Sequence, residues 1–540
     1  MKNFMSEKRT WIMIVFITLG GGILRTLCCF WGYPCQLHPD EHTIVDSAIE
    51  MLSRHSWESY VYNRPDQFEI KCCSVLFQIF SFLRYRIPAY EAFELHPGAF
   101  YVVARFYTVF WGCALIPFGA LLAGKMFKKE ERLQAPIQIL TAGLFAFSYI
   151  FVQHSAYATP DIVLTFFFVV IAYESLNYLE NGSMKALYFI AVLTGIAITI
   201  KYPAAVITLY IAYIVIYRAV TFKQHRVIVP VGFQCAGIIL ITMFITAPNL
   251  FTDIHTLIGI FEREARTAHL GADGLGLFGN MNYYFTTAVN SFGYVSAICF
   301  FCGLAHLIRS HRKEYLPLLL NAGYWMILSI LPLHWLRWGF PMYIAYVLIA
   351  AAGFLFLFEQ CRTHIKNRFA ASGIRFAVAT AGIIGMTSIL LTSVSIVVHS
   401  LKEDTRVHAM EYCAANDITV DNSIYEGYTP LHTAVRKPQH DCFVLEEDGS
   451  VTVVPELADK EYLVISSSYK KRYAAKPELY PAENMIYQGI ENTYPLIYSV
   501  SGKGINHKAN DLKNIREQIK YLLSGESLTG NSIYIYDLKP

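Results

Sequence analysis

Charged residues are scarce in this sequence. Lys, Arg, Asp and Glu make up 16% of its 540 residues, whereas 54% of the residues are hydrophobic. A soluble domain normally carries about 25% charged residues, so this deficit excludes a soluble globular protein and indicates a polytopic membrane protein. The formal net charge is only +3, and no basic tract interleaved with aromatic residues is present, so no nucleic-acid partner is indicated.

Several other features are missing. The twelve cysteines contain no C-x-x-C pair with a matching partner pair, which makes a zinc site unexpected. No repeat of solenoid period and no low-complexity linker occurs. The first apolar segment has no clean small-residue cleavage site, so we do not interpret it as a cleaved signal peptide.

Long apolar runs dominate the chain up to residue 399. About eleven runs have the length and hydropathy of membrane spans. They are residues 11–30, 99–124, 135–152, 162–179, 186–200, 204–217, 227–247, 283–308, 316–333, 340–358 and 374–398. The sequence predicts a polytopic α-helical membrane domain over residues 1–399, in which residues 31–98 form a first outer loop with amphipathic helices. The two short runs beside Lys201 leave a re-entrant hairpin open as an alternative.

The basic loops predict the orientation. Four loops between the spans carry clusters of Lys and Arg. If the spans alternate and their number is odd, these loops share one side with the basic N-terminus, and the positive-inside rule assigns that side to the cytoplasm. The N-terminus is then inside, and the first outer loop and the region after residue 399 are outside.

Residues 400–540 have a different character. Residues 461–466 and 532–536 alternate or run apolar as strands do, and residues 514–523 read as a helix. We expect a small extracytoplasmic α/β domain. Its two cysteines, Cys413 and Cys442, could form a disulfide or remain free thiols, and spacing alone does not decide between them.

An acidic stretch follows the first span. His38, Asp40 and Glu41 precede a segment whose apolar residues recur at helical spacing. These residues are Ile44, Ala48, Met51 and Leu52. Such a helix is expected to lie along the membrane surface and to hold a carboxylate at the water–lipid boundary. Asp40 is a candidate general base and equally a candidate helix cap, and the two roles are compatible.

More ionisable residues fall in or near the predicted outer connections, where charge at membrane depth is costly and usually functional. They are Arg105, His154, Asp161, Lys201, Glu262, His269 and Arg337. All of them except Arg105 also have an ordinary interpretation. Lys201 could snorkel, Asp161 could cap a helix and Arg337 could belong to an aromatic belt. Arg105 lies too deep to snorkel easily, His154 could pack at the interface, and Glu262 and His269 could lie on a solvated loop.

One reaction needs an outward carboxylate and several cations at a membrane face. In glycosyl transfer from a polyprenyl-phosphate sugar, a carboxylate takes the proton of the attacking hydroxyl. Arg or Lys stabilises the negative charge that grows on the leaving phosphate. The residues therefore favour a membrane glycosyltransferase.

Five short motifs, in order over roughly the first 340 residues, carry a resemblance to a known family. They are His38-Pro39-Asp40-Glu41, Ala104-Arg105, residues 158–167, residues 195–203, and Arg337 with Pro341. The chain resembles the type C (GT-C) membrane glycosyltransferases, in the bacterial branch akin to the dolichyl-phosphate-mannose–protein mannosyltransferases and the lipid A aminoarabinose transferase. The resemblance implies a GT-C fold and an inverting hexosyl or pentosyl transfer from a polyprenyl-phosphate sugar.

The resemblance also implies roles for residues. Asp40 is the expected general base, and Glu41 shapes the site beside it. Arg105, Lys201 and Arg337 are expected to face the donor phosphate. The expected substrate cavity is lined by His38, Lys71, His154, Asp161, Glu262 and His269. Many relatives have Lys-Pro-Pro or His-Pro-Pro where this chain reads Glu69-Ile70-Lys71-Cys72-Cys73, which leaves the role of Lys71 open.

The implied partners are a polyprenyl-phosphate sugar, membrane lipid and a lipid, glycan or protein acceptor. The implied location is a bacterial plasma membrane. No cofactor is assigned, and a divalent metal ion stays open because metal use varies among branches. Three alternatives remain: a transporter or flippase for a lipid-linked sugar, which usually has two matching halves, a polysaccharide polymerase or ligase, and a non-catalytic relative with an interaction role.

Overall fold

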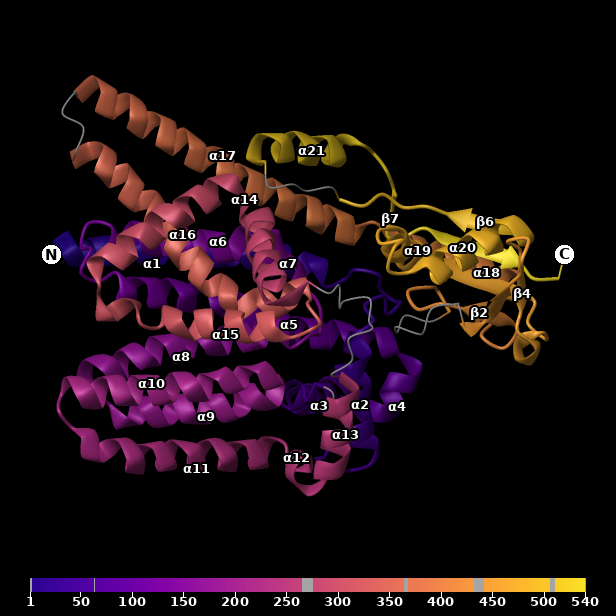
Figure 1. The fold of residues 1–540 in the computed structure, drawn as a ribbon, viewed down its shortest axis with the longest axis horizontal. Helices are drawn as coiled ribbons and strands as arrows, with labels where there is room; N and C mark the ends of the chain where they lie inside the picture. Colours follow the sequence, from indigo (N-terminus) through magenta and orange to yellow (C-terminus); the bar gives the residue numbers. More distant parts are fainter. Residues whose placement is uncertain are drawn as a thin grey trace. The chain divides into compact units, whose positions relative to one another are not determined.

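The computed structural model describes residues 2–62, 64–264, 275–363, 368–431, 441–505 and 510–539. The chain folds into two compact units (Figure 1). The first unit consists of the described parts of Met1–Cys29, Thr43–Val397 and His507–Lys520. The second consists of the described parts of Phe30–His42, Val398–Asn506 and Tyr521–Pro540. The segment that carries Asp40 therefore folds with the C-terminal region.

The first unit is helical, and its elements follow one another along the chain. They are α1 (Lys2–Cys28), α2 (Glu41–Ser53), α3 (Gln67–Arg84), α4 (Ala89–Leu95), α5 (Pro97–Met126), α6 (Gln134–Phe147), α7 (Tyr149–Ser155), α8 (Asp161–Asn181), α9 (Met184–Ile200), η1 (Tyr202–Ala205), α10 (Val206–Thr221), η2 (His225–Val227), α11 (Ile228–Thr246), α12 (Asn249–Thr252), α13 (Ile254–Glu264), α14 (Gly276–Ser310), η3 (Lys313–Tyr315), α15 (Leu318–Ile330), η4 (Leu336–Gly339), α16 (Phe340–Thr363), α17 (Arg368–Leu401) and α21 (Asp511–Leu523). The last residues of α17 and α21 and the first two of α2 belong to the second unit.

These helices make the chain a multi-pass membrane protein. Every predicted apolar run coincides with a helix or, for residues 135–152, with the pair α6 and α7. Among the described residues, eight helices are long and apolar enough to cross a membrane, and nine if α6 and α7, bent by 54°, form one span. Of the remaining runs, α9 has 17 residues and α15 has 13. The polytopic helical fold is thus confirmed, whereas the side on which the N-terminus lies stays a prediction.

The first outer loop of the prediction contains α2, α3 and α4. The predicted apolar face of α2 is real, because Ile44, Ala48 and Met51 are at most 2% exposed. These side chains join a core with Phe77 of α3 and Phe100 of α5. Protein rather than lipid therefore covers this face, which differs from the expectation of a helix lying with its apolar side in the membrane surface.

The second unit is the expected small α/β fold. Its main sheet has the order β2 (Ser423–Tyr425), β5 (Tyr462–Ser466), β8 (Ile533–Asp537), β6 (Leu496–Val500), and only the β2–β5 pair is parallel. Two short pairs flank it: β1 (Glu403–Asp404) with β7 (Leu528–Thr529), and β3 (Phe443–Leu445) with β4 (Val451–Val453). The helical elements are α18 (Thr405–Ala415), η6 (Pro455–Leu457), α19 (Ser467–Ala474) and α20 (Pro481–Thr493).

The predicted strands 461–466 and 532–536 are β5 and β8, which form the centre of this sheet. Their buried side chains, among them Val464, Ile533 and Ile535, pack against α18. The predicted helix 514–523 is α21, but most of it packs in the first unit. Cys413 and Cys442 are both free cysteines in the structure.

Candidate active site

A buried carboxylate forms the centre of the candidate site. Lys201 Nζ donates to Asp161 Oδ1 at 2.6 Å, and Arg337 Nε lies 3.5 Å from Asp161 Oδ2. Asp161 is 2% exposed and Lys201 is 7% exposed, so little water screens these charges. We name these three residues the Asp161 cluster. Its two cations face one carboxylate, and the excess positive charge suits the binding of an anion.

The three residues of the Asp161 cluster all lie where a helix begins or ends. Asp161 is the first residue of α8, where the helix dipole favours a carboxylate. Lys201 ends α9 in an extended conformation with φ −156° and ψ 124°, two residues before Pro203, which cannot continue an α-helix. Arg337 lies in η4, directly before α16. Three connections far apart in the sequence therefore meet at one carboxylate, and the structure brings together three of the predicted site residues.

An aromatic ring completes the surroundings of Lys201. Its Nζ lies 5.1 Å from the centre of the Trp338 ring, within the range of a cation–π interaction. Trp338 directly follows Arg337, the residue that could belong to an aromatic belt at the membrane interface. In the structure Trp338 also holds the lysine that pairs with Asp161.

The segment before α3 supplies further charges near Lys201. The Asp66 amide donates to the carbonyl of Ile200 at 3.3 Å, and Arg64 Nε lies 2.7 Å from Asp66 Oδ2. Glu69 is 1% exposed. Its burial and, secondarily, the carboxylate of Asp66 raise its pKa well above the usual range. Burial therefore favours the neutral form of Glu69, and that form would not cancel the charge of the cations in the Asp161 cluster.

Arg105 lies elsewhere in the first unit. It is 1% exposed, and its Nη1 donates to the Cys29 carbonyl at 2.9 Å, just past the end of α1, where helix carbonyls lack partners of their own. One turn earlier on α5, the Tyr101 hydroxyl donates to Asp46 Oδ1 of α2 at 2.8 Å. Arg105 thus fixes the end of the first span, and its contact with a donor phosphate stays a prediction.

The acidic stretch forms a turn in the second unit. The Asp40 amide donates to His38 Nδ1 at 3.2 Å, and the Glu41 amide donates to the His38 carbonyl at 3.4 Å. Glu41 begins α2 and is fully buried, whereas Asp40 is partly exposed. His38 therefore shapes the turn that presents Asp40 before α2. The general-base role of Asp40 stays a prediction.

Lys71 occupies the end of a neighbouring helix rather than the Asp161 cluster. Its Nζ donates to Gln67 Oε1 at 3.1 Å and to the carbonyl of Thr246, the last residue of α11, at 2.5 Å. A helix C-terminus favours a cation, while burial lowers the pKa of Lys71 to about 8. These contacts give Lys71 a place in the fold, and its predicted contact with substrate is untested.

Of the remaining predicted residues, His154 lies near enough to Asp161 for a Coulombic interaction with it. The ring of His154 packs 5.1 Å from Phe340 and 5.5 Å from Tyr157, measured between ring centres. Glu262 is an exposed residue of α13. His269 lies outside the described residues.

Arg25 is a buried charge that the sequence analysis did not single out. It is fully buried, and it donates to the carbonyls of Phe145 at 2.7 Å and Ala146 at 2.9 Å and to Ser155 Oγ at 3.1 Å. These acceptors lie on both sides of the bend between α6 and α7. A single arginine inside the apolar run 11–30 was the available signal. Arg64, Asp66 and Glu69 lie in a polar stretch, where charged residues are common, so no such signal in the sequence marks their place near Lys201.

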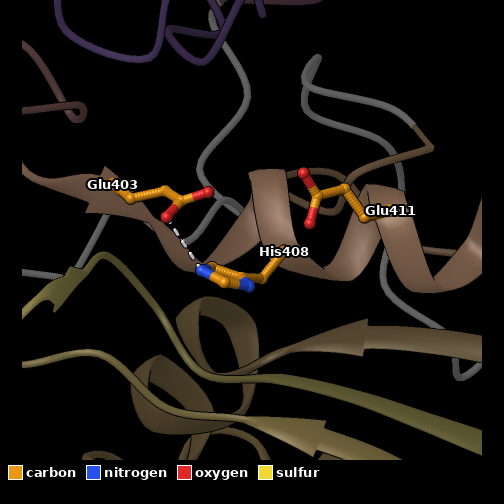
Figure 2. Close-up of side chains that lie close together, drawn as sticks. All are labelled: Glu403, His408 and Glu411. Atoms are coloured by element: carbon orange, nitrogen blue, oxygen red, sulfur yellow. Dashed lines mark ion pairs between the residues drawn. The ribbon is translucent and has the colours of Figure 1, made fainter.

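One group of side chains in the described part of the chain could hold a metal ion. It consists of Glu403 of β1 with His408 and Glu411 of α18, whose ligand atoms lie within 4.8 Å of one another. Figure 2 shows that Glu403 and His408 already form an ion pair, with 2.9 Å between Oε2 and Nε2. Both glutamates are exposed. An exposed pair of this kind is ordinary on a protein surface, so we assign no metal to it.

A family model matches part of the chain. Residues 105–251 match the model described as dolichyl-phosphate-mannose-protein mannosyltransferase. The match includes Arg105, Asp161 and Lys201 and ends before Arg337. No curated protein gives a significant match to the chain.

Solved structures align with most of the chain. The archaeal oligosaccharyltransferase AglB from Archaeoglobus fulgidus, in complex with an inhibitory peptide and a dolichol-phosphate, aligns with a TM-score of 0.52 and 12% identity over 93% of this chain and 74% of that chain. The same enzyme tethered to an acceptor peptide aligns with a TM-score of 0.53 and 11% identity over the same shares. ArnT from Cupriavidus metallidurans bound to undecaprenyl phosphate aligns with a TM-score of 0.47 and 12% identity over 86% of this chain and 94% of that chain. At these identities the archaeal matches establish the fold alone.

Proposed function

We propose that this chain, which has the fold of the type C membrane glycosyltransferases and a mannosyltransferase-like segment within it, transfers a sugar from a polyprenyl-phosphate donor to an acceptor hydroxyl. The donor lipid is proposed by analogy with the dolichol-phosphate and undecaprenyl phosphate bound by the similar structures. The sugar and the acceptor are left open.

The observation that carries this proposal is the Asp161 cluster. Lys201 and Arg337 both face Asp161, and burial of Glu69 favours its neutral form, which would not compensate their charge. A lipid phosphate placed here would receive charge-assisted hydrogen bonds from Lys and Arg, which strengthen as negative charge grows on the leaving group. The buried position makes each of these bonds stronger than it would be in water.

Asp40 is the proposed general base. The acceptor oxygen forms a bond to the anomeric carbon, while the bond from that carbon to the phosphate oxygen breaks and its electron pair leaves with the polyprenyl phosphate. The hydroxyl proton goes to the Asp40 carboxylate. A single displacement of this kind inverts the anomeric configuration. We further propose that the reaction takes place on the extracytoplasmic side of a plasma membrane, as the basic loops predict.

The test is turnover by the purified full chain in lipid nanodiscs. A panel of radiolabelled undecaprenyl- and dolichyl-phosphate sugars is offered with lipid, glycan and peptide acceptors, and release of the free polyprenyl phosphate is followed. We expect release with at least one donor and a fall of about 10²- to 10⁴-fold in Asp40→Asn.

The matched control is Asp421→Asn, an exposed aspartate of the second unit, which should keep full turnover. A transporter or flippase would move the intact donor across the membrane without releasing polyprenyl phosphate. Full turnover in Asp40→Asn would refute the assignment of the base, and translocation without release would refute glycosyl transfer.

A further inference from the structure

The loop that carries Asp40 contacts the C-terminal region through one buried arginine. Arg406 Nη1 donates to the Leu37 carbonyl at 2.7 Å, three residues before Asp40. The Arg406 guanidinium also lies 5.5 Å from the centre of the Trp31 ring, near the start of the same loop. One side chain therefore contacts the loop at two places. These residues all belong to the second unit.

Arg406 is itself held rigidly. Its Nε and Nη2 donate to the two carboxylate oxygens of Asp404 at 2.8 and 3.0 Å, the paired geometry that fixes a guanidinium in one plane. Asp404 Oδ1 also accepts from the Arg406 amide at 3.0 Å and so caps α18. Asp404 and Arg406 are 1% and 5% exposed. The arginine thus has its charge neutralised within the C-terminal region and still donates to the loop.

The backbone at Gly530 leaves space for the Asp404 carboxylate. Gly530, the residue after β7, has φ +99°, and a Cβ there would lie 2.8 Å from both Asp404 carboxylate oxygens. Only glycine accepts this conformation readily and leaves that space. The pairing of β1 with β7 carries Asp404 to this place.

The loop is shaped to receive the arginine. Gly32 has φ +71°, and a Cβ on it would lie 2.3 Å from Leu37 Cδ1. The Leu37 side chain therefore packs closely over Gly32 and is 3% exposed, while its carbonyl accepts from Arg406. The next residue, His38, accepts from the amides of Asp40 and Glu41. A continuous series of contacts leads from Arg406 through Leu37 and His38 to Asp40.

We propose that Arg406 is a positioning residue for glycosyl transfer: it anchors Leu37 and thereby sets the turn that presents Asp40. This inference rests on the proposed role of Asp40 as general base. It makes the C-terminal region a component of the catalytic apparatus, because the region supplies the support of the base. Arg406 itself touches no reacting atom.

The experiment measures the loop and the reaction separately in the full chain in nanodiscs. Hydrogen–deuterium exchange resolved on peptides covering residues 30–42 reports the order of the loop, and steady-state turnover reports kcat and KM for the donor. In Arg406→Gln we expect exchange of these peptides to rise by about tenfold or more, the factor that corresponds to the loss of one hydrogen bond from a charged group. We expect kcat to fall by about 10- to 100-fold with the donor KM changed little, because misplacement of a catalytic group lowers the rate of the chemical step.

Two further variants guard against general unfolding. Arg406→Lys keeps a cationic donor without the paired geometry and should restore part of the kcat lost in Arg406→Gln. Gly32→Ala disturbs the loop from its own side and should raise exchange in residues 30–42 while the exchange of β5 stays unchanged. The control Arg472→Gln removes an arginine that lies 5.7 Å from the centre of the Tyr428 ring in the same unit and should leave loop exchange and kcat as they are.

Unchanged loop exchange in both Arg406→Gln and Gly32→Ala would overturn the anchor. Increased exchange with unchanged kcat would overturn the positioning role. Full turnover in Asp40→Asn would refute the proposed function instead, and the exchange measurement would still decide whether Arg406 anchors the loop.

Discussion

Two ion clusters in this protein differ in the number of cations that face one buried carboxylate. In the Asp161 cluster one carboxylate faces both Lys201 and Arg337, the latter at 3.5 Å. In the second unit, Asp404 pairs with Arg406 alone through hydrogen bonds of 2.8 and 3.0 Å to both carboxylate oxygens. The first cluster has excess positive charge, and the second is balanced.

This difference indicates that the two clusters have different roles, one in binding a ligand and the other in supporting the fold. A balanced pair has no net charge with which to attract an anion, and breaking it leaves a buried charge without compensation. A cluster with a surplus cation can receive an anion without first losing its own contacts. We therefore expect the Asp161 cluster to bind the donor phosphate. The Asp404–Arg406 pair should contribute to order and stability and should affect turnover only through the position of Asp40.

The largest effect is expected for Lys201→Met. It removes the better-placed cation but keeps the length of the side chain, so kcat/KM for the donor should fall by about 10³-fold, in the range seen when one charge-stabilising donor is lost. The matched control is Lys125→Met. In the native chain, Lys125 Nζ lies 4.5 Å from the centre of the Tyr173 ring. A loss of less than fivefold in Lys201→Met, or an equal loss in both variants, would remove the distinction between the clusters.

Asp404→Asn should lower stability more than turnover chemistry. It leaves Arg406 buried without its counter-ion, and we expect the second unit to lose about 3 to 5 kcal/mol of its free energy of unfolding. Hydrogen exchange of β5 in the full chain measures this loss. Unchanged protection of β5 would show that the pair does not support the unit.

Glu426 tests a third situation, a buried acid for which no cation partner lies among the described residues. Its carboxylate accepts from the Tyr487 hydroxyl and from the Ser466 amide at 2.9 Å, and burial raises its pKa to about 8 from the ordinary value of 4.5. Because the folded pKa is the higher one, the stabilising effect of the neutral form is complete below pH 4.5 and is lost as the pH rises through about 8.

Glu426→Gln removes this titration. Between pH 5 and pH 9, the free energy of unfolding of the second unit should fall by about 2 to 4 kcal/mol more in the native chain than in the variant. Each pH unit of the titration corresponds to about 1.4 kcal/mol. Exchange of β5, corrected for the intrinsic pH dependence of amide exchange, gives the comparison. Parallel pH profiles for the two proteins would show that Glu426 is ionised in the folded state.

Asp161→Asn tests the Asp161 cluster by changing its carboxylate rather than one of its cations. The substitution removes the negative charge that competes with an anion for Lys201 and Arg337. We expect undecaprenyl phosphate to inhibit the variant about tenfold more strongly, since a charge a few ångströms away contributes on the order of 1 to 4 kcal/mol near a protein surface. Weaker inhibition would mean that Asp161 positions the cations rather than competing with the phosphate.

The smallest effect is expected for Glu69→Gln. Burial, with Asp66, raises the pKa of Glu69 well above its usual range, so the amide replaces a carboxyl group that is already neutral. Turnover should change by less than about threefold, which corresponds to under 0.7 kcal/mol. A loss of tenfold or more would show that Glu69 is charged in the working enzyme and would reduce the surplus charge of the Asp161 cluster.

Much of the fold could be predicted from the sequence. Apolar runs of the right length become helices because the backbone must satisfy its own hydrogen bonds in lipid. The predicted strands 461–466 and 532–536, read from alternating or apolar runs, are β5 and β8. Asp161, Lys201 and Arg337 were among the seven ionisable residues singled out near the outer connections, since charges at the ends of spans are rare enough to point to a site. The sequence did not distinguish these three from the other four. The sequence could not predict that protein covers the apolar face of α2, because hydropathy does not distinguish a protein neighbour from lipid.

Other features depend on contacts between distant residues. Arg406 and Leu37 are 369 positions apart, and neither has an unusual local sequence. Arg64 and Asp66 lie in a polar stretch where charges are common, and their place beside Ile200 depends on how α3 packs. The neutral state of Glu69 depends on burial, which its own sequence neighbours do not reveal.

The most direct test of the difference between the two clusters is the binding of undecaprenyl phosphate to the full chain in nanodiscs. Affinity would be measured for the native chain, Lys201→Met and Arg406→Gln at one salt concentration. We predict that Lys201→Met weakens binding by about tenfold or more, the effect of losing one charge-assisted hydrogen bond, and that Arg406→Gln leaves the affinity unchanged. Equal affinity in the native chain and Lys201→Met would contradict the assignment of the Asp161 cluster as the phosphate site.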